Sequence, residues 1–355
     1  MTSELGQKLS RLRLMMAANN HDAVHLAQLG NLSWLLCGAD MLSLINEPVA
    51  EAIVTSKHVT VVASSIEQPR LEQEELPKGV ELVYAPWYDA QAKEKILADL
   101  LKGKVLSDTP GRGFDTKDFW PMRVPLTIEE IERYRKMSRE ASEVFTEGLQ
   151  MIEPGLTEHQ VVGLLAEGLH AKGMQPVVML AASDDRLEHY KHPLPSDKKI
   201  EKRFMAVTCV RKHGLITSLT RLVSFGGETS EYKKRYAKLL EVEKTILDYT
   251  QHGIIVSELF GELQAAYTKA GREEAWKDHH QGGPTGYNTR DFIATPTETR
   301  MLVDGSAYAW NPSLPGVKVE DTILLLNDKL EILTEDPRWP LRETGGRLRP
   351  EVLEL

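Results

Sequence analysis

The nine residues at positions 279–287 combine chemically active side chains with glycines, in the order HHQGGPTGY. Glycine loses much conformational freedom on folding and adds little to a core, so such a stretch is usually retained for a site. We expect His280 to donate a hydrogen bond to a substrate oxygen, and the backbone of Gly282 and Gly283 to let a substrate approach closely. The alternative is a glycine-rich turn whose histidines find partners within the fold.

Two residues elsewhere in the chain have side chains suited to acid–base chemistry. His192 lies in a proline-rich loop, and imidazole titrates near neutral pH, so this residue could transfer protons. Its alternatives are a plain surface histidine, or a role taken by the neighbouring His189 or Tyr190. Glu320 lies in an apolar strand, where a buried carboxylate needs a partner such as a histidine or a cationic substrate group. A charge that faces water on an edge strand is the other interpretation.

Two arginines could hold a substrate carboxylate through paired hydrogen bonds. They are Arg221 and Arg290, and Arg221 is equally suited to a structural ion pair. Asp291 is a candidate partner for Arg290. Cys209 lies in an apolar strand and is expected to be an inert buried thiol.

The second half of the chain must position these residues, and its pattern predicts an α+β domain. Thr127 and Glu130 form a capping box that begins a long helix, and Thr157 with Gln160 caps the helix that follows. The later periodicities predict strands at 177–181, 204–210, 215–225, 307–311, 317–325 and 331–333, with helices at 231–249 and 257–270 between them. The histidines at 279 and 280 then lie in a loop, and Glu320 lies in a strand.

The first half alternates helical and extended patterns, which indicates a separate α/β domain. An amphipathic helix opens it, and the remaining patterns predict strands at 23–29, 52–56, 58–63, 81–85 and 104–108 and a helix at 90–101. Prolines and glycines between 110 and 125 break the pattern. We therefore predict domains at 1–122 and 123–340, with a C-terminal tail at 341–355.

The overall composition narrows the class of protein. The net charge is −9 over 355 residues, without a large basic block, which argues against a nucleic-acid or anionic-membrane partner. Two cysteines far apart indicate a reducing compartment. The N-terminus lacks the apolar core of a signal peptide, and no apolar run reaches membrane-spanning length. We expect a cytoplasmic protein.

Four stretches of the second half together resemble the creatinase/aminopeptidase P/prolidase family. They are the turn IEPGLTE at 152–158, the loop HPLPSDKKIE at 192–201, LTR at 219–221, and VEDT at 319–322 with a following LT at 333–334. The N-terminal half also resembles the family. The resemblance implies a ribonuclease-H-like α/β N-terminal domain and a pita-bread α+β C-terminal domain that holds the active site. It also implies a homodimer in which the partner helps to close the pocket.

The peptidases of this family bind two divalent ions through two Asp, one His and two Glu residues. In this chain residues 204–221 contain no acid at all, and Ser218 occupies the second Asp position. Asn311 replaces one Glu, so only His280 and Glu320 match the ligand set. Two ligands cannot hold two dications, and we expect no metal pair and no cofactor. One ion held by His280, His279 and Glu320 is the alternative left open.

The resemblance to the metal-free creatinase branch implies a metal-independent hydrolase. It would cleave a C–N bond in a small amide, amidine or guanidino substrate. His192 would move protons, His280 would polarise the substrate, and Glu320 would hold a cationic group or activate water. Substrate contacts would come from His279, Gly282, Gly283, Tyr287, Arg221, Arg290 and Asn311.

Two other functions fit the same residues. One is a metal-dependent Xaa-Pro aminopeptidase or dipeptidase with atypical ligands. The other is a non-catalytic binding protein on the peptidase fold. The partner in each case is a small molecule or a short peptide.

Overall fold

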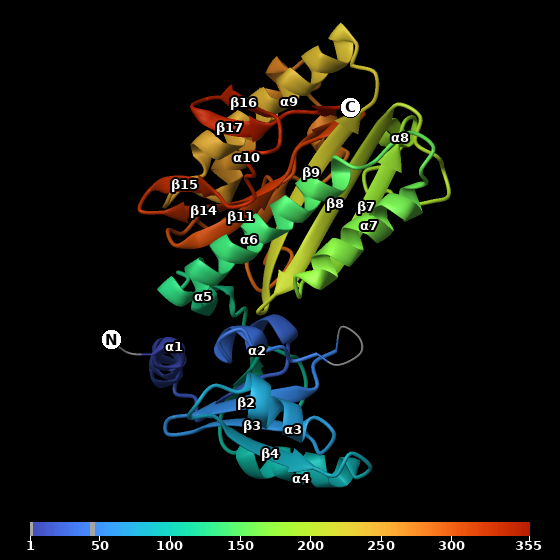
Figure 1. The fold of residues 1–355 in the computed structure, drawn as a ribbon. Coiled ribbons are helices and arrows are strands. Elements are labelled where there is room, and N and C mark those ends of the chain that lie inside the picture. Colours follow the sequence, from blue (N-terminus) through green and yellow to red (C-terminus); the bar gives the residue numbers. More distant parts are fainter. Residues whose placement is uncertain (1–2, 43–46) are drawn as a thin grey trace. The chain divides into compact units, whose positions relative to one another are not determined.

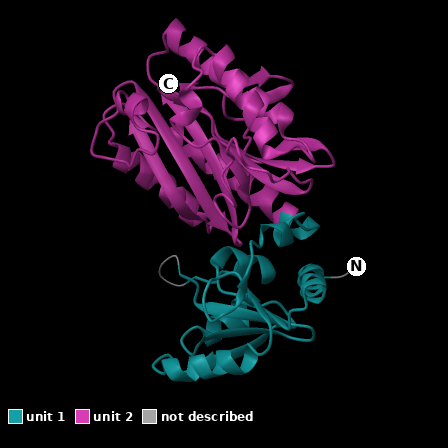
Figure 2. Cartoon of the chain, turned by 180° about the vertical axis from the view of Figure 1, so that it is seen from behind, with its two compact units in different colours: residues 1–130 teal, residues 131–355 magenta. Residues whose placement is uncertain are grey.

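A computed structural model describes residues 3–42 and 47–355 of the chain. The chain divides between Glu130 and Ile131 into two compact units, which are coloured separately in Figure 2. Within the described ranges no helix has the length and apolar character needed to cross a membrane. Each unit is described by itself below.

The first unit is built on a six-stranded mixed sheet with the order β4-β3-β2-β1-β5-β6. Its strands are β1 (Ala23–Leu26), β2 (Ala50–Thr55), β3 (Val59–Ser64), β4 (Glu81–Ala85), β5 (Val105–Ser107) and β6 (Asp115–Thr116). Its main helices are α1 (Glu4–Asn19), α2 (Leu29–Leu35) and α4 (Ala90–Leu100), and the short α3 (Gln68–Arg70) and α5 (Trp120–Arg123) complete it. The predicted α/β class is therefore confirmed for this half.

The first strand ends earlier than the predicted residue 29. The carboxylate of Asp108 accepts hydrogen bonds from the backbone amides of Ala27, at 2.8 Å, and Gln28, at 3.0 Å. These amides are then unavailable to the sheet, and α2 begins directly afterwards at Leu29. A distant side chain sets this boundary, which local periodicity does not reveal.

The second unit contains a four-stranded sheet with the order β18-β9-β8-β7. The strands are β7 (Gln175–Ser183), β8 (Arg203–Lys212), β9 (Leu215–Ser224) and β18 (Leu353–Glu354). Helices α6 (Ile128–Leu149) and α7 (Glu158–Ala171) lie along one face of this sheet in Figure 1. Phe145 and Leu165 of these helices share a buried core with Phe204 and Leu219 of the strands.

Both capping boxes predicted from the sequence are confirmed. The backbone amide of Thr127 donates to Oε2 of Glu130 at 2.7 Å, and the amide of Glu130 donates to Oγ1 of Thr127 at 3.3 Å. Thr157 and Gln160 make the same reciprocal pair at the start of α7. Each pair satisfies backbone amides that a helix leaves without partners at its first turn.

A second four-stranded sheet has the order β10-β11-β14-β15. Its strands are β10 (Gly282–Thr285), β11 (Ser306–Trp310), β14 (Asp321–Leu326) and β15 (Lys329–Ile332), and β12 (Ser313–Leu314) and β13 (Val317–Lys318) form a hairpin beside it. Helices α9 (Ser230–Tyr249) and α10 (Val256–Lys269) pack against each other in the same unit. The indole of Trp310 donates to Oγ1 of Thr250 at 3.0 Å, which ties β11 to the end of α9.

The expectation that residues 279–287 form a loop is wrong for its centre, because Gly282–Thr285 is strand β10, antiparallel to β11. A Cβ atom at Gly282 would lie 2.1 Å from the carbonyl oxygen of Ala309. One at Gly283 would lie 2.3 Å from that of Phe292. Both positions have positive φ, at +102° and +156°, so glycine is required by backbone packing itself.

The chain's last segment belongs to the second unit. Strands β16 (Leu341–Thr344) and β17 (Arg347–Pro350) form a hairpin, and β18 pairs in parallel with β9. Arg349 on β17 is 2% exposed and binds both oxygens of the buried Glu243. The residues expected as a tail thus add three short strands and a buried ion pair to this unit.

Candidate active site

A cavity of about 540 Å³ in the second unit collects five of the candidate residues. His192, His280, Arg290, Asn311 and Glu320 all line it. The same cavity has an apolar wall, formed by Val178, Leu180, Val207 and Ile293. A volume of this size suits a small molecule or a short peptide.

Glu320 is the acidic residue of the cavity and is 2% exposed. Its Oε1 accepts from Nη2 of Arg290 at 2.7 Å, and its Oε2 accepts from Nζ of Lys318 at 2.9 Å and from Oγ1 of Thr220 at 2.9 Å. Burial opposes its ionisation, but the positive charges of Lys318 and Arg290 outweigh burial and lower the pKa of Glu320 to about 2. The carboxylate is therefore ionised at neutral pH, with both oxygens engaged.

Lys318 is the residue of this group that sequence reasoning missed. It is 6% exposed and lies two positions before Glu320 in an extended segment. Residues two apart in extended chain face the same side, so the KVE spacing at 318–320 carried a usable signal. The Arg290 guanidinium is held further by Oγ of Ser218, at 3.3 Å, and by the carbonyl oxygen of Thr289, at 2.6 Å.

Three imidazoles form a cluster near Lys318 and Glu320, whose charges act on all of them. Nε2 of His192 lies 2.8 Å from Nε2 of His279, and the rings of His279 and His280 stack with centroids 4.3 Å apart. Burial is the main cause that lowers the pKa of His279 to about 3 and of His280 to about 4, and positive charges nearby add to it. Burial and Lys318 also lower the pKa of His192. All three rings are neutral at pH 7.

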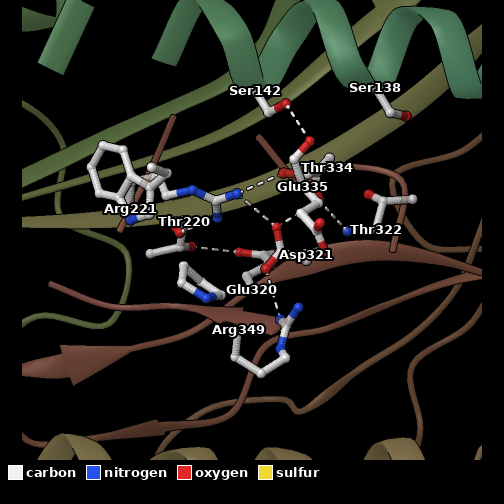
Figure 3. Close-up of polar contacts among 12 residues, drawn as sticks. Ser138, Ser142, Thr220, Arg221, Glu320, Asp321, Thr322, Thr334, Glu335 and Arg349 are labelled. Carbon is white, nitrogen blue, oxygen red and sulfur yellow. Dashed lines mark hydrogen bonds and ion pairs between the residues drawn. The ribbon is translucent and has the colours of Figure 1, made fainter. Parts of the chain in front are cut away.

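Arg221 does not line the cavity. Its side chain is 3% exposed, and Nη2 donates to Oδ1 of Asp321 at 3.0 Å and to the carbonyl oxygen of Thr334 at 2.7 Å. In Figure 3 Arg221 and Arg349 lie on opposite sides of Asp321. Tyr287 is 3% exposed and is also absent from the residues that line the cavity.

Glu320 lies between β13 and β14, so the prediction of one continuous strand at 317–325 is wrong there, and backbone contacts fix its position. The amide of Thr220 donates to the carbonyl oxygen of Glu320 at 2.9 Å, so β9 meets the second sheet here. The amide of Ser218 donates to Oγ1 of Thr322 at 2.7 Å, and that hydroxyl donates to the carbonyl oxygen of Ser218 at 3.0 Å. The carboxylate of Glu320 is thereby held in a defined position.

The residues of this cavity do not fit the pair of metal ions implied by the family resemblance. Two dications need several anionic oxygens, and Glu320 is the single carboxylate among the described residues that line the cavity. Arg290 and Lys318 bind both of its oxygens. Burial raises the pKa of the Cys209 thiol, which lines the cavity and receives a hydrogen bond from Ser218.

Comparison with known proteins identifies relatives of the second unit. Residues 132–327 match the model of metallopeptidase family M24. An uncharacterized peptidase of Staphylococcus aureus strain MW2 is 22% identical over 218 residues, which cover 58% of this chain and 61% of that protein. An uncharacterized peptidase of Staphylococcus saprophyticus is 24% identical over 220 residues. The match spans about three fifths of the length of these curated relatives.

Solved structures match the fold of nearly the whole chain. The prolidase from Pyrococcus horikoshii has a TM-score of 0.79 at 20% identity, and the match covers 93% of this chain and 98% of that one. The Xaa-Pro dipeptidase from Bacillus anthracis also has a TM-score of 0.79, at 18% identity, and covers 99% and 100%. The N-terminal domain of the FACT complex subunit SPT16 from chickpea has a TM-score of 0.71 at 14% identity over 93% and 96%.

These matches confirm the predicted α/β N-terminal domain followed by a pita-bread domain. They also show that the fold is not limited to proteins named as peptidases. The family match spans more than half of the chain and includes every candidate residue of the cavity. The chain belongs to metallopeptidase family M24, with a cavity in which basic side chains take the oxygens of its one carboxylate.

Proposed function

We propose that this chain is an M24-type hydrolase that cleaves the amide C–N bond of a small substrate bearing a carboxylate, such as a short peptide, without a pair of metal ions. The observation that carries the proposal is the engagement of both oxygens of Glu320 by Arg290 and Lys318. Glu320 then serves to hold the positively charged side chains of Arg290 and Lys318 in the cavity. The family supports hydrolysis of a peptide-like bond.

The charge of the cavity favours an anionic substrate group. Two cations and one carboxylate leave one net positive charge, since the three imidazoles are neutral at pH 7. A carboxylate can bind Arg290 or Lys318 in a partly dry site, where such contacts are strong. The same excess charge opposes an amidine or guanidino cation, because Glu320 has no unengaged oxygen to receive it. Among the expected substrates, the amide class is therefore the best supported.

The reaction needs a base for water and an acid for the leaving nitrogen. A water oxygen bonds to the carbonyl carbon, the C–N bond breaks, and a water proton moves to the leaving amine. His192 and His280 are neutral and line the cavity, so either can accept a proton from water and return it to nitrogen. The low pKa values make them weak bases and ready acids. Positive charge from Arg290 or Lys318 can stabilise the oxyanion.

The test is a hydrolysis assay on matched substrates. Dipeptides, including Xaa-Pro dipeptides, and N-acyl amino acids are compared with the same compounds whose carboxylate is amidated, each with chelator or with added Zn²⁺, Mn²⁺ or Co²⁺. We expect kcat/KM to be at least about tenfold higher for the carboxylate compounds than for the amidated ones, because amidation removes one charged contact. Equal rates for the amidated compounds, or no cleavage under any condition, would contradict the proposal.

A second candidate is a metal-dependent Xaa-Pro dipeptidase with atypical ligands. It is favoured by the similarity to a prolidase and an Xaa-Pro dipeptidase over nearly the whole chain. A metal pair would have to displace Arg290 and Lys318 from Glu320 at the cost of two buried ion pairs. Elemental analysis that finds two ions per chain, with cleavage of Xaa-Pro peptides lost on chelation, would favour this candidate.

The non-catalytic alternative predicts binding without turnover. A carboxylate ligand that raises the melting temperature yet is never cleaved would support it. His280 and Glu320 do share one cavity, the arrangement that a catalytic site requires. The homodimer implied by the family resemblance stays a prediction, which sedimentation analysis can test.

A further inference from the structure

We propose that His192, His279 and His280 form a binding site for one transition-metal ion of the Zn²⁺ class. The site differs from the family's metal pair because it uses no carboxylate. It goes beyond the proposed hydrolysis, and it stands whether or not the chain turns over a substrate. The three residues come from two segments that are 87 positions apart, so only the fold brings them together.

The geometry of the cluster suits a single small ion. Each imidazole offers one nitrogen, and the three nitrogens lie within 4.8 Å of one another. Zn–N bonds of about 2.0–2.1 Å place the nitrogens of a tetrahedral site about 3.4 Å apart. The Nε2 atoms of His192 and His279 are already 2.8 Å apart. Around an ion these two atoms would separate to about 3.4 Å, and the ring of His280, now stacked on that of His279, would turn towards the ion, with a fourth position left for water or a ligand.

The hydrogen bonding of the cluster is incomplete without an ion. His279 is 8% exposed, and its Nδ1 has no hydrogen-bond partner in the described parts of the chain; the same holds for Nδ1 of the half-buried His280. Buried polar nitrogens normally have partners. Neutral imidazole is the form of histidine that binds metal. An ion bound through Nδ1 of either ring would take a nitrogen that has no partner among the described residues, and one bound through Nε2 would replace the contact between His192 and His279.

Lys318 is the feature that opposes the ion. Its positive charge acts on all three histidines. Glu320, whose Oε2 lies 2.9 Å from Nζ, compensates this charge only in part, because the same carboxylate also pairs with Arg290, which acts on His280 as well. The remaining positive charge sets the affinity for an ion below that of an isolated three-histidine site. Replacing Lys318 by methionine should therefore strengthen metal binding, because it removes a repulsion and leaves the negative charge of Glu320 nearby.

The experiment measures metal binding directly on the tag-free full chain. Zn²⁺ is titrated by calorimetry, and Co²⁺ is followed by its visible absorption, which reports the coordination. We expect one ion per chain, and a loss of at least about tenfold in affinity for His192→Ala and for His279→Ala. His189→Ala is the matched control, because His189 is exposed on α8 (Arg186–His189) and is not part of the cluster. Circular dichroism checks that each variant is folded.

Several outcomes would overturn the proposal. They are the absence of saturable binding, binding that survives the double His192→Ala/His279→Ala change, and weaker binding in Lys318→Met. The fates of the two proposals can be separated. Hydrolysis that persists in a chain shown to bind no metal rejects the ion and keeps the proposed function. One bound ion in a chain that cleaves none of the tested substrates supports the metal site and rejects the proposed hydrolysis.

Discussion

Glu320 and Asp321 are neighbours in sequence, and each lies at the centre of a buried charged cluster. Asp321 binds Arg221 and Arg349, and Arg349 also binds Glu243, so two acids balance two bases. Glu320 binds Arg290 and Lys318, which leaves one positive charge in excess. The balanced cluster is closed off within the unit, whereas the unbalanced one lines the cavity. The excess charge, rather than burial or the number of ion pairs, distinguishes a candidate site from a structural network.

The largest expected effect is on the balanced cluster. Arg349→Met would leave Glu243 and Asp321 buried with one shared cation removed, and we expect a loss of about 3–5 kcal/mol in the free energy of unfolding. Urea denaturation measures it. Arg347→Met is the control, since Arg347 pairs with the half-exposed Asp248 and should cost less than about 1 kcal/mol. Equal losses would show that the closed network has no special role.

The next effect is on ligand binding at the unbalanced cluster. Lys318→Met removes the excess charge, so a carboxylate ligand of the cavity should bind at least about tenfold more weakly. Calorimetry with a carboxylate compound that the protein binds measures the change. Lys244→Met, which removes a surface pair with Asp248, serves as the control. Unchanged affinity would remove the argument that the cavity selects anions.

The stability contributed by Glu320 in the unbalanced cluster should depend on pH. The pKa of Glu320 is about 2 in the folded chain against an ordinary 4.5, so its ionised form stabilises the fold fully above 4.5. That contribution is lost as the pH falls from 4.5 towards 2. Glu320→Gln should therefore show a smaller drop in stability between about pH 6 and about pH 3 than the unmodified chain. Urea midpoints at both pH values test this, with Glu331→Gln as the control, since Glu331 is only partly buried and pairs with Arg135 outside the cavity. An identical drop in both chains would contradict it.

The smallest expected effect comes from one hydroxyl of the balanced cluster. Oγ1 of Thr334 donates to Asp321 at 2.6 Å and accepts from the amide of Thr322 at 3.1 Å. Thr334→Val should cost about 1–2 kcal/mol of stability, because two buried groups lose a partner. Thr268→Val, at an exposed helical position, should change it by less than about 0.5 kcal/mol. Thermal melts of both variants give the comparison, and equal melting temperatures would show that this hydroxyl is dispensable.

Much of the scaffold was predictable because its signals are local. The capping boxes at Thr127 and Thr157 depend on residues three positions apart, and the long helices depend on an apolar period within one segment. The strand at 282–285 was missed because its glycines resemble a loop. These glycines allow the strand to pass close to the backbone at Ala309 and Phe292, and no local sequence pattern shows that contact.

By itself the sequence determined the family, the two-domain fold and the absence of acids from residues 204–221, since these follow from residue types in order along the chain. Only the tertiary structure decided what replaces those acids. Arg290 reaches one oxygen of Glu320 across 30 positions, and His192 meets His279 across 87 positions. Charge and coordination act through distances of a few ångströms, and such distances between remote segments exist only once the chain has folded.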